Sequence, residues 1–210
     1  MLPPEEGRIT QSAALLVEGR DEERFFAALL KHTGLVGVWV KGFGGRTNIE
    51  DGIAGARQLP GFEANVRSLG VERDANGDAQ AAFQSVCGAL QRSRLPVPAR
   101  PMQTVREGGL RVTTMILPGA GEPGMLEDVC LRSLDGRPEQ ECVEGLSQCL
   151  GERGLPELRQ PAKARAHAYL ATQEKPGLRV GEAVEAGYWD FGHPAFDQMK
   201  HFLLLVAGEA

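Results

Sequence analysis

The sequence predicts an α/β protein: a three-layer sandwich with a mostly parallel sheet, followed by a C-terminal helical extension. Short apolar runs alternate with helical patterns from Ala13 to Gln91, as in the β–α units that build a parallel sheet. The first run, Ala13–Val17, is apolar throughout, which is typical of a strand covered on both faces. From Pro138 onward only helical patterns follow. A chain of 210 residues is long enough to bury a sizeable core.

These patterns divide the chain into two parts. We expect residues 1–135 to form the α/β core and residues 136–210 to form helices packed on it, within one compact domain. The helices expected in the second part cover residues 139–150, 162–172 and 194–206, with a polar break at 172–179.

The first β–α unit places an acid where ligands bind. The strand Ala13–Val17 ends at Glu18, Gly19 allows a sharp turn, and Asp21 is a candidate N-cap for a helix over Glu22–Lys31. In open α/β sheets, ligands bind beyond the carboxyl ends of the strands. Glu18 is therefore a candidate metal ligand, and the alternative is a solvated acid or a helix cap. The two roles of Asp21, helix cap and metal-site residue, do not exclude each other.

The second unit carries a glycine-rich turn. A strand over 36–41 is followed by Gly42–Arg46 and by a helix over 49–59, with Asn48 as its cap. Successive backbone N–H groups in the turn formed by Gly44, Gly45 and Arg46 can make an anion-binding nest. The alternative is an ordinary β–α connection without a ligand.

The third unit repeats the acidic strand end. A strand over 66–73 leads to Asp74, and a helix is expected over Asp78–Gln91. Glu18 and Asp74 would then lie at equivalent ends of two parallel strands. Converging carboxylates repel unless a cation neutralises them, and hard oxygen ligands favour Mg²⁺ or Mn²⁺. Asp78 either caps its own helix or adds a carboxylate to the site.

A hairpin and a third acidic pair follow. Strands over 102–106 and 110–117 flank a glycine turn, which predicts an antiparallel strand at the edge of the sheet. Pro123 suits the first turn of the next helix, in which Glu127 and Asp128 occupy the opening turns. This pair is either a further part of the metal site or a solvated helix start.

Composition limits the classes of function. The formal net charge of −5 argues against tight nucleic-acid binding through a basic surface. The N-terminus lacks the pattern of a signal peptide and no apolar run is long enough to span a membrane, so a cytoplasmic location is expected. The four cysteines show no CxxC spacing and fall in helical patterns, which favours reduced core thiols: Cys87, Cys130, Cys142 and Cys149.

An aromatic segment lies near the C-terminus. Tyr188–Phe196 holds four aromatic side chains and a histidine within nine residues. Aromatic faces can stack on nucleic-acid bases, so the segment could be a recognition surface. The alternative is that it anchors the C-terminal part to the core.

Several of these segments, in this order, resemble a known family. Val17-Glu18-Gly19 followed by acids, and the Asp-x-Asp-like Asp74-Ala75-Asn76, resemble the Toprim domain of topoisomerases, DnaG-type primases and OLD-family nucleases. Three further segments resemble small bacterial stand-alone Toprim-like proteins: Gly44–Asn48, Leu117–Asp128 and Tyr188–Phe191. The resemblance covers most of the chain. Where the family has a second Asp, this chain has Asn76.

The resemblance implies a metal site and a class of chemistry. Its implied catalytic residues are Glu18, Asp74 and Glu127, and its implied Mg²⁺ or Mn²⁺ ligands are Glu18, Asp74, Asn76, Glu127, Asp128 and Asp21. It implies Mg²⁺-dependent phosphodiester chemistry, such as that of a nuclease. The alternative is a catalytically weak or inactive binding module for a nucleotide, a nucleic acid or a protein partner, including a second copy of the chain.

Overall fold

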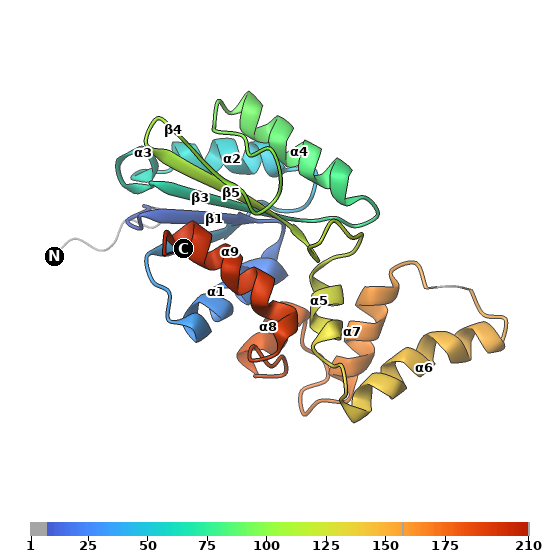
Figure 1. Ribbon diagram of the computed structural model, residues 1–210. Coiled ribbons are helices and arrows are strands. Elements are labelled where there is room, and N and C mark those ends of the chain that lie inside the picture. Colours follow the sequence, from blue (N-terminus) through green and yellow to red (C-terminus); the bar gives the residue numbers. More distant parts are fainter. Residues whose placement is uncertain (1–7, 157, 210) are drawn as a thin grey trace.

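A five-stranded, mostly parallel sheet forms the centre of the computed structural model, which describes residues 8–156 and 158–209 (Figure 1). The strand order is β2-β1-β3-β5-β4, and only β4 runs antiparallel to its neighbour. The strands are β1 (Ala13–Val17), β2 (Val38–Gly42), β3 (Ser68–Asp74), β4 (Thr104–Glu107) and β5 (Leu110–Leu117). The expected α/β class, with an antiparallel edge strand, is confirmed.

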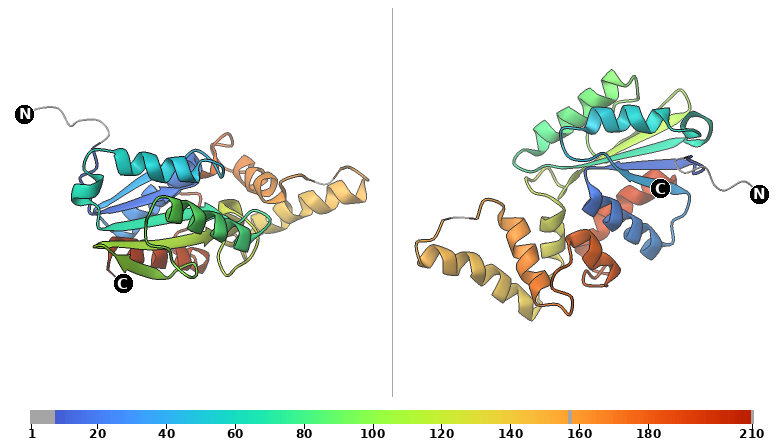
Figure 2. Two further views of the ribbon diagram at one scale, coloured as in Figure 1. Left: turned by 90° about the horizontal axis from the view of Figure 1, so that it is seen from above. Right: turned by 180° about the vertical axis from the view of Figure 1, so that it is seen from behind.

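Helices cover both faces of the sheet (Figures 1 and 2). One face is covered by α2 (Ile49–Gln58), α3 (Phe62–Asn65) and α4 (Ala79–Arg92). The other is covered by α1 (Arg20–Thr33) and α9 (Asp197–Ala207), with α8 (Val180–Glu185) packed against α1. Side chains of β1 alternate between the two layers, because successive residues of a strand point to opposite faces.

The remaining helices lie to one side of this sandwich. They are α5 (Leu126–Arg132), α6 (Pro138–Glu152) and α7 (Pro161–Ala171), and α7 contacts both α5 and α6. Figures 1 and 2 show α6 and α7 beyond the carboxyl edge of the sheet, away from the strands. The chain then returns through α8, a short 3-10 helix (Pro194–Phe196) and α9, which packs on β1, β3 and β5. The sequence predicted two parts, residues 1–135 and residues 136–210. Met1–Gly7 of the first part, and Glu157 and Ala210 of the second, lie outside the described residues.

Some local expectations were wrong. The N-cap of α1 is Gly19, and Asp21 lies inside the first turn of the helix. Pro123 precedes the helix that was expected to start there, because α5 begins at Leu126. The short helices α3 and α8 were not expected, since neither is long enough to show a clear period. The cap role of Asp78 is confirmed, because its Oδ1 accepts a hydrogen bond from Ala81 N at 2.9 Å.

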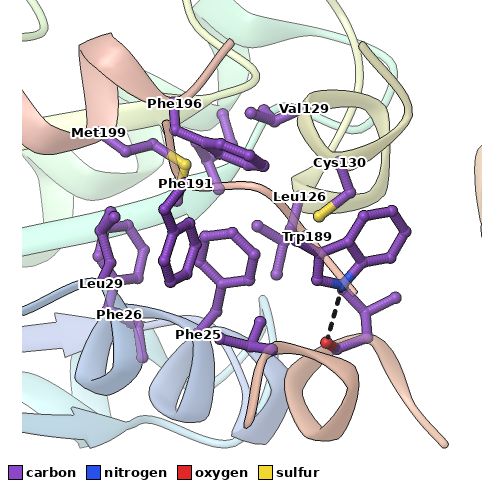
Figure 3. Packing of buried hydrophobic residues seen from close by; sticks show 14 of the residues in the cluster. Phe25, Phe26, Leu29, Leu126, Val129, Cys130, Trp189, Phe191, Phe196 and Met199 are labelled. Atoms are coloured by element: carbon purple, nitrogen blue, oxygen red, sulfur yellow. Dashed lines mark hydrogen bonds between the residues drawn. The ribbon is translucent and has the colours of Figure 1, made fainter. Parts of the chain in front are cut away.

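The aromatic segment near the C-terminus is part of the core. Figure 3 shows Trp189, Phe191 and Phe196 packed among buried residues of α1, α5 and α9. The Phe191 ring meets the Phe25 ring edge-on at 5.2 Å between centroids, and Trp189 Nε1 donates a hydrogen bond to Val180 O at 3.3 Å. The anchoring interpretation therefore holds for these side chains, and base stacking on them is excluded by their burial.

The cysteines are only partly as expected. All four are free thiols, but only Cys130 is buried; Cys87 is partly exposed, and Cys142 and Cys149 are exposed on α6. The sequence misled here because α6 extends beyond the sandwich, so much of its surface meets solvent. Within residues 8–156 and 158–209, no helix is both long and apolar enough to cross a membrane.

The packing of α9 on the sheet gives a stability prediction. A Cβ added at Gly70 of β3 would lie 2.6 Å from Val206 Cγ2 and 3.0 Å from Leu15 Cδ1. Gly70→Ala should therefore lower the free energy of unfolding by about 1–3 kcal/mol, the usual cost of overpacking. Gly55→Ala is the matched control: a Cβ there meets nothing within 4 Å in α2, so it should stabilise by up to about 1 kcal/mol. Equal midpoints for the two variants in urea denaturation would contradict this packing.

Candidate functional site

Parallel pairing brings Glu18 and Asp74 together. In the β1–β3 register, Leu16 is opposite Val71, so both strands end at the same edge of the sheet. The backbone N–H of Asp74 donates a hydrogen bond to Glu18 Oε2 at 3.3 Å. The Asp74 side chain lies in the interior, with 6% of the residue exposed. The geometry expected for these two acids is therefore present.

The start of α5 adds Glu127 to the same edge. Leu126 N donates to Asp74 Oδ1 at 3.1 Å, which ties the first turn of α5 to the end of β3. Glu127, the next residue, is buried, and its Oε1 lies 3.9 Å from Lys163 Nζ of α7. Asp128 acts mainly as a helix cap, because its Oδ2 accepts from Met125 N at 2.8 Å.

Two further acids belong to this cluster, and the sequence analysis missed both. Glu72 is fully buried, and its Oε2 accepts from Glu18 N at 3.2 Å. Its other oxygen, Oε1, has no hydrogen-bond partner among the described residues. Glu22 lies in the first turn of α1 and is close enough to Glu18, Asp74 and Glu127 to interact electrostatically. The signal for Glu72 was its spacing, since residues 72 and 74 of one strand share a face.

Burial raises the pKa of all five carboxyl groups of the cluster, and repulsion between acids adds to the rise for four of them. For each of Glu18, Glu22, Glu72, Asp74 and Glu127 the largest cause is burial, which disfavours the charged form. Neighbouring acids add to the effect for Glu22, Glu72, Asp74 and Glu127. The pKa of Glu22 rises to about 7, whereas those of Glu72 and Asp74 rise well above their ordinary values. The cluster therefore holds protons that isolated carboxyl groups would have lost.

Three cations partly oppose this charge. Arg73 Nε lies 3.8 Å from Glu18 Oε2, and the charges of Arg73, Lys163 and Arg46 each lower the pKa of Glu18. Burial outweighs them, so the pKa of Glu18 is still raised. These cations leave the cluster with more acids than bases, which favours a bound cation.

The donor atoms suit a hard divalent cation, although they do not converge on one point. Carboxylate oxygens are the ligands that Mg²⁺ and Mn²⁺ prefer, and Glu72 Oε1 is a buried oxygen without a partner. Within the described part of the chain, however, no three His, Cys, Asp or Glu side chains are grouped closely enough to hold an ion. Several carboxylates are turned toward backbone N–H groups instead: Glu18 to Asp74, Glu72 to Glu18, Asp74 to Leu126 and Asp128 to Met125. A shared ion would require side-chain rotation.

The other candidate ligands lie around this cluster. Asp21 Oδ1 accepts from Gly181 N at 3.2 Å, which links α1 to α8. Asn76 has a left-handed backbone, with φ 53°, and pairs with Gly124 in an isolated bridge. Its side-chain Nδ2 is 3.5 Å from Asp74 O, so the amide is turned back toward the strand end.

The glycine-rich turn is tied to the end of β1. Gly44 and Gly45 have positive φ angles of 83° and 107°, and Gly45 N donates to Glu18 O at 2.8 Å. Asn48 does not cap α2 through its side chain; its Nδ2 donates to Gly44 O at 2.9 Å. The N–H group of Gly45 is therefore already bonded to the residue that follows β1. The turn also holds Arg46 close to Glu18.

A comparison with protein families gives a match over residues 12–207, to a family described as "Protein of unknown function (DUF3226)". The chain belongs to the DUF3226 family. The search of curated proteins gave no match. Among solved structures, this DUF3226 chain is similar to the C-terminal region of the OLD protein of Xanthomonas campestris pv. campestris. The two share 13% sequence identity with a TM-score of 0.45, over 95% of this chain and 98% of the other.

The raised pKa of Glu22 predicts a pH-dependent stability. As pH rises, the unfolded state loses this proton near pH 4.5 and the folded state only near pH 7. Stability is therefore unaffected below about pH 4.5, falls between pH 4.5 and 7, and stays lower above pH 7. The loss attributable to Glu22 is up to about 3 kcal/mol.

The measurement is a series of thermal melts from pH 4 to 8 in metal-free buffer with a chelator. Glu22→Gln, which cannot ionise, should show a flatter decline than the parent, and Glu107→Gln on the exposed strand β4 should follow the parent. Parallel curves for Glu22→Gln and the parent would show that Glu22 ionises normally in the folded state.

Proposed function

We propose that the chain binds Mg²⁺ or Mn²⁺ at the carboxyl edge of the sheet and hydrolyses phosphodiester bonds of nucleic acid. The observation that carries this proposal is the gathering of five acids around the ends of β1 and β3, where Glu72 accepts from Glu18 N, Glu18 from Asp74 N, and Asp74 from Leu126 N, next to Glu127. Burial raises the pKa of all five, and repulsion between acids adds to the rise for four of them. Such repulsion lowers stability, and a divalent cation would relieve it. Sites that perturb pKa values in this way are frequently functional.

The ligands we propose for the ion lie at the ends of β1 and β3 and in the first turn of α5. Glu18, Asp74 and Glu127 are the principal ones; Asn76, Asp128 and Asp21 lie close around them. A bound divalent ion in such a site lowers the pKa of water and polarises phosphoryl oxygens. Oxygen donors with this much charge favour Mg²⁺ or Mn²⁺ over softer metals.

Side chains of the chain itself supply the proton chemistry. Glu22, with its pKa near 7, is about half ionised at neutral pH and can take up or release a proton there. Lys163, beside Glu127, provides a positive charge on the α7 side of the cluster, where a phosphate oxygen would be stabilised.

Water is the nucleophile we propose, because neither tyrosine is available. Tyr169 is buried, and its hydroxyl donates to Tyr188 O at 2.8 Å. The hydroxyl of Tyr188 accepts from Lys175 N at 3.0 Å. These are the two tyrosines of the sequence. Their positions disfavour the covalent tyrosine intermediate of strand-passing enzymes and favour hydrolysis.

The second candidate is a binding module that holds metal or nucleotide without turnover. One observation favours it: Asn76 supplies a neutral amide where the Toprim pattern has a second Asp, and that amide is turned toward Asp74 O. Nuclease assays separate the two candidates.

Metal binding should raise the melting temperature of the parent. A ligand that binds only the folded state stabilises it by about 2.7 kcal/mol at a hundredfold excess over its dissociation constant. Mn²⁺ should therefore stabilise the parent and the control Glu107→Gln, but not Glu18→Gln or Asp74→Asn. An equal rise in all four proteins would place the ion elsewhere. For the enzymatic function, cleavage of a labelled DNA or RNA should require the same residues.

Replacing Asn76 by Asp tests the departure from the Toprim pattern. The added carboxylate should tighten Mn²⁺ binding, since affinity depends on the charge of the ligands. Without metal it should lower the melting temperature, because Asp74 is close and buried and like charges repel. The sizes of the two side chains are nearly equal, and both tolerate a left-handed backbone. If the melting temperature is unchanged both with and without Mn²⁺, residue 76 does not face the ion, and the binding-module candidate is favoured over the nuclease.

A further inference from the structure

A small pocket lies beside the acidic cluster, at the end of β3 and on the α4 side of the sheet. It has a volume of about 280 Å³, and its lining includes Arg46, Arg73, Asn76 and Asp78. Arg73 follows Glu72 and precedes Asp74, so it points to the opposite face of the strand from these two acids. Glu18 lies at the boundary, since its carboxylate approaches both Arg73 and the backbone of Asp74.

Arg73 has unused hydrogen-bonding capacity. Its side chain is only 12% exposed, and its Nε and Nη1 have no hydrogen-bond partner among the described residues. The nearest acid, Glu18 Oε2, is 3.8 Å from Nε, too far for a hydrogen bond. A buried donor without a partner costs free energy, and such a group in a folded protein calls for an unseen partner.

The charge around the pocket favours an anion. Arg46 is exposed on the glycine-rich turn and is near enough to Glu18 to lower its pKa, as Arg73 does. Asp78 also lines the pocket, but its Oδ1 accepts from Ala81 N as the cap of α4. Two guanidinium groups therefore face the carboxylate of Asp78, which already caps α4, and the carboxylate of Glu18 at the boundary, which already accepts from Asp74 N.

The chemistry and size indicate one oxyanion. A planar guanidinium can donate two parallel hydrogen bonds to two oxygens of one phosphate, whereas the ammonium group of a lysine cannot. A volume of about 280 Å³ is too small for most drug-sized ligands, but it is sufficient for a phosphate with part of its sugar. The unpartnered donors of Arg73 fit this occupant better than an apolar one.

We propose that this pocket holds a phosphate group of the nucleic-acid substrate, bound by Arg73 and Arg46 next to the carboxylate of Glu18. This assignment rests on the proposed nuclease function for its substrate, although phosphate binding itself does not require metal. It gives Arg73 and Arg46 a positioning role: they hold one phosphate of the strand on the α4 side, while Glu127 and Lys163 lie on the α5 and α7 side.

The test is a titration with inorganic phosphate in metal-free buffer, followed by NMR of the backbone amides and of the arginine Nε–H signals. The Arg73 Nε–H signal and the amides of Asn76 and Gly77 should shift. Arg73→Lys, which keeps the charge but loses the fork, should weaken binding at least about tenfold, the effect of one charge-assisted hydrogen bond. Arg46→Ala, an exposed change that should not disturb folding, should also weaken it. Arg106→Ala on β4 is the matched control and should bind like the parent.

Two further arms identify the source of the phosphate. Thymidylyl-thymidine, with a single diester, and its 5′-phosphorylated form are titrated in the same way. Binding of both assigns the pocket to the backbone diester, whereas binding of the phosphorylated form alone assigns it to a strand end. Unmoved signals with inorganic phosphate would overturn the anion site, and binding of phosphate without either dinucleotide would overturn its assignment to nucleic acid.

The phosphate titration tests the anion site separately from the proposed metal site. The phosphate titration is repeated with Glu18→Gln, which should still bind phosphate because the guanidinium groups remain. If the parent binds phosphate but shows no stabilisation by Mn²⁺, the metal-dependent function fails and the anion site stands. If Mn²⁺ stabilises the parent but phosphate leaves the pocket signals unchanged, the reverse holds.

Discussion

The withdrawal of several carboxyl groups from water at one edge of the sheet is the constraint on which the rest of this structure depends. Parallel pairing of β1 and β3 forces Glu18 and Asp74 to one edge of the sheet, and Glu72 and Glu22 crowd the same region. Removing one charge from water is costly, and like charges in one place raise the cost further. The two apolar layers around the sheet must supply enough stability to hold these acids together. A cluster that opposes folding in this way is more readily explained by a function than by packing.

A chain of hydrogen bonds connects this cluster to the surrounding elements. Glu18 N donates to Glu72, Asp74 N donates to Glu18, and Leu126 N donates to Asp74. The start of α5 is therefore positioned by the same carboxylate that is proposed to bind metal. Because α7 packs on α5 and carries Lys163, a rotation of Asp74 would also affect the helices beyond the sheet. The helical part that follows the sheet is thus coupled to the site by a backbone contact.

Local sequence signals were sufficient for most of the elements and for part of the site. The run Ala13–Val17 matched β1 residue for residue, and Asp78 was found as a cap, because strand length and cap chemistry are local properties. Glu18 and Asp74 could be paired in advance because parallel strands share an edge. Glu22 escaped detection because an acid in the first turn of a helix is common, and Glu72 because it lies within a strand that reads as ordinary. What distinguishes them from solvated acids is their surroundings in the fold: Glu72 is fully buried, and Glu22 is partly buried beside the other acids.

The sequence by itself determined the α/β class, the strand ends and the chemical types available there, since hydrophobic period and turn residues act over a few positions. Only the tertiary structure decided which side chains meet. It buried Trp189 and Phe191 in the core, exposed Cys142 and Cys149, and placed Arg73 beside Glu18 with Nε and Nη1 lacking a hydrogen-bond partner among the described residues. These outcomes depend on contacts between residues far apart in the chain, and on the solvent and charge that those contacts exclude. The pattern of residues along the sequence does not reveal these contacts, or how far they exclude solvent and charge.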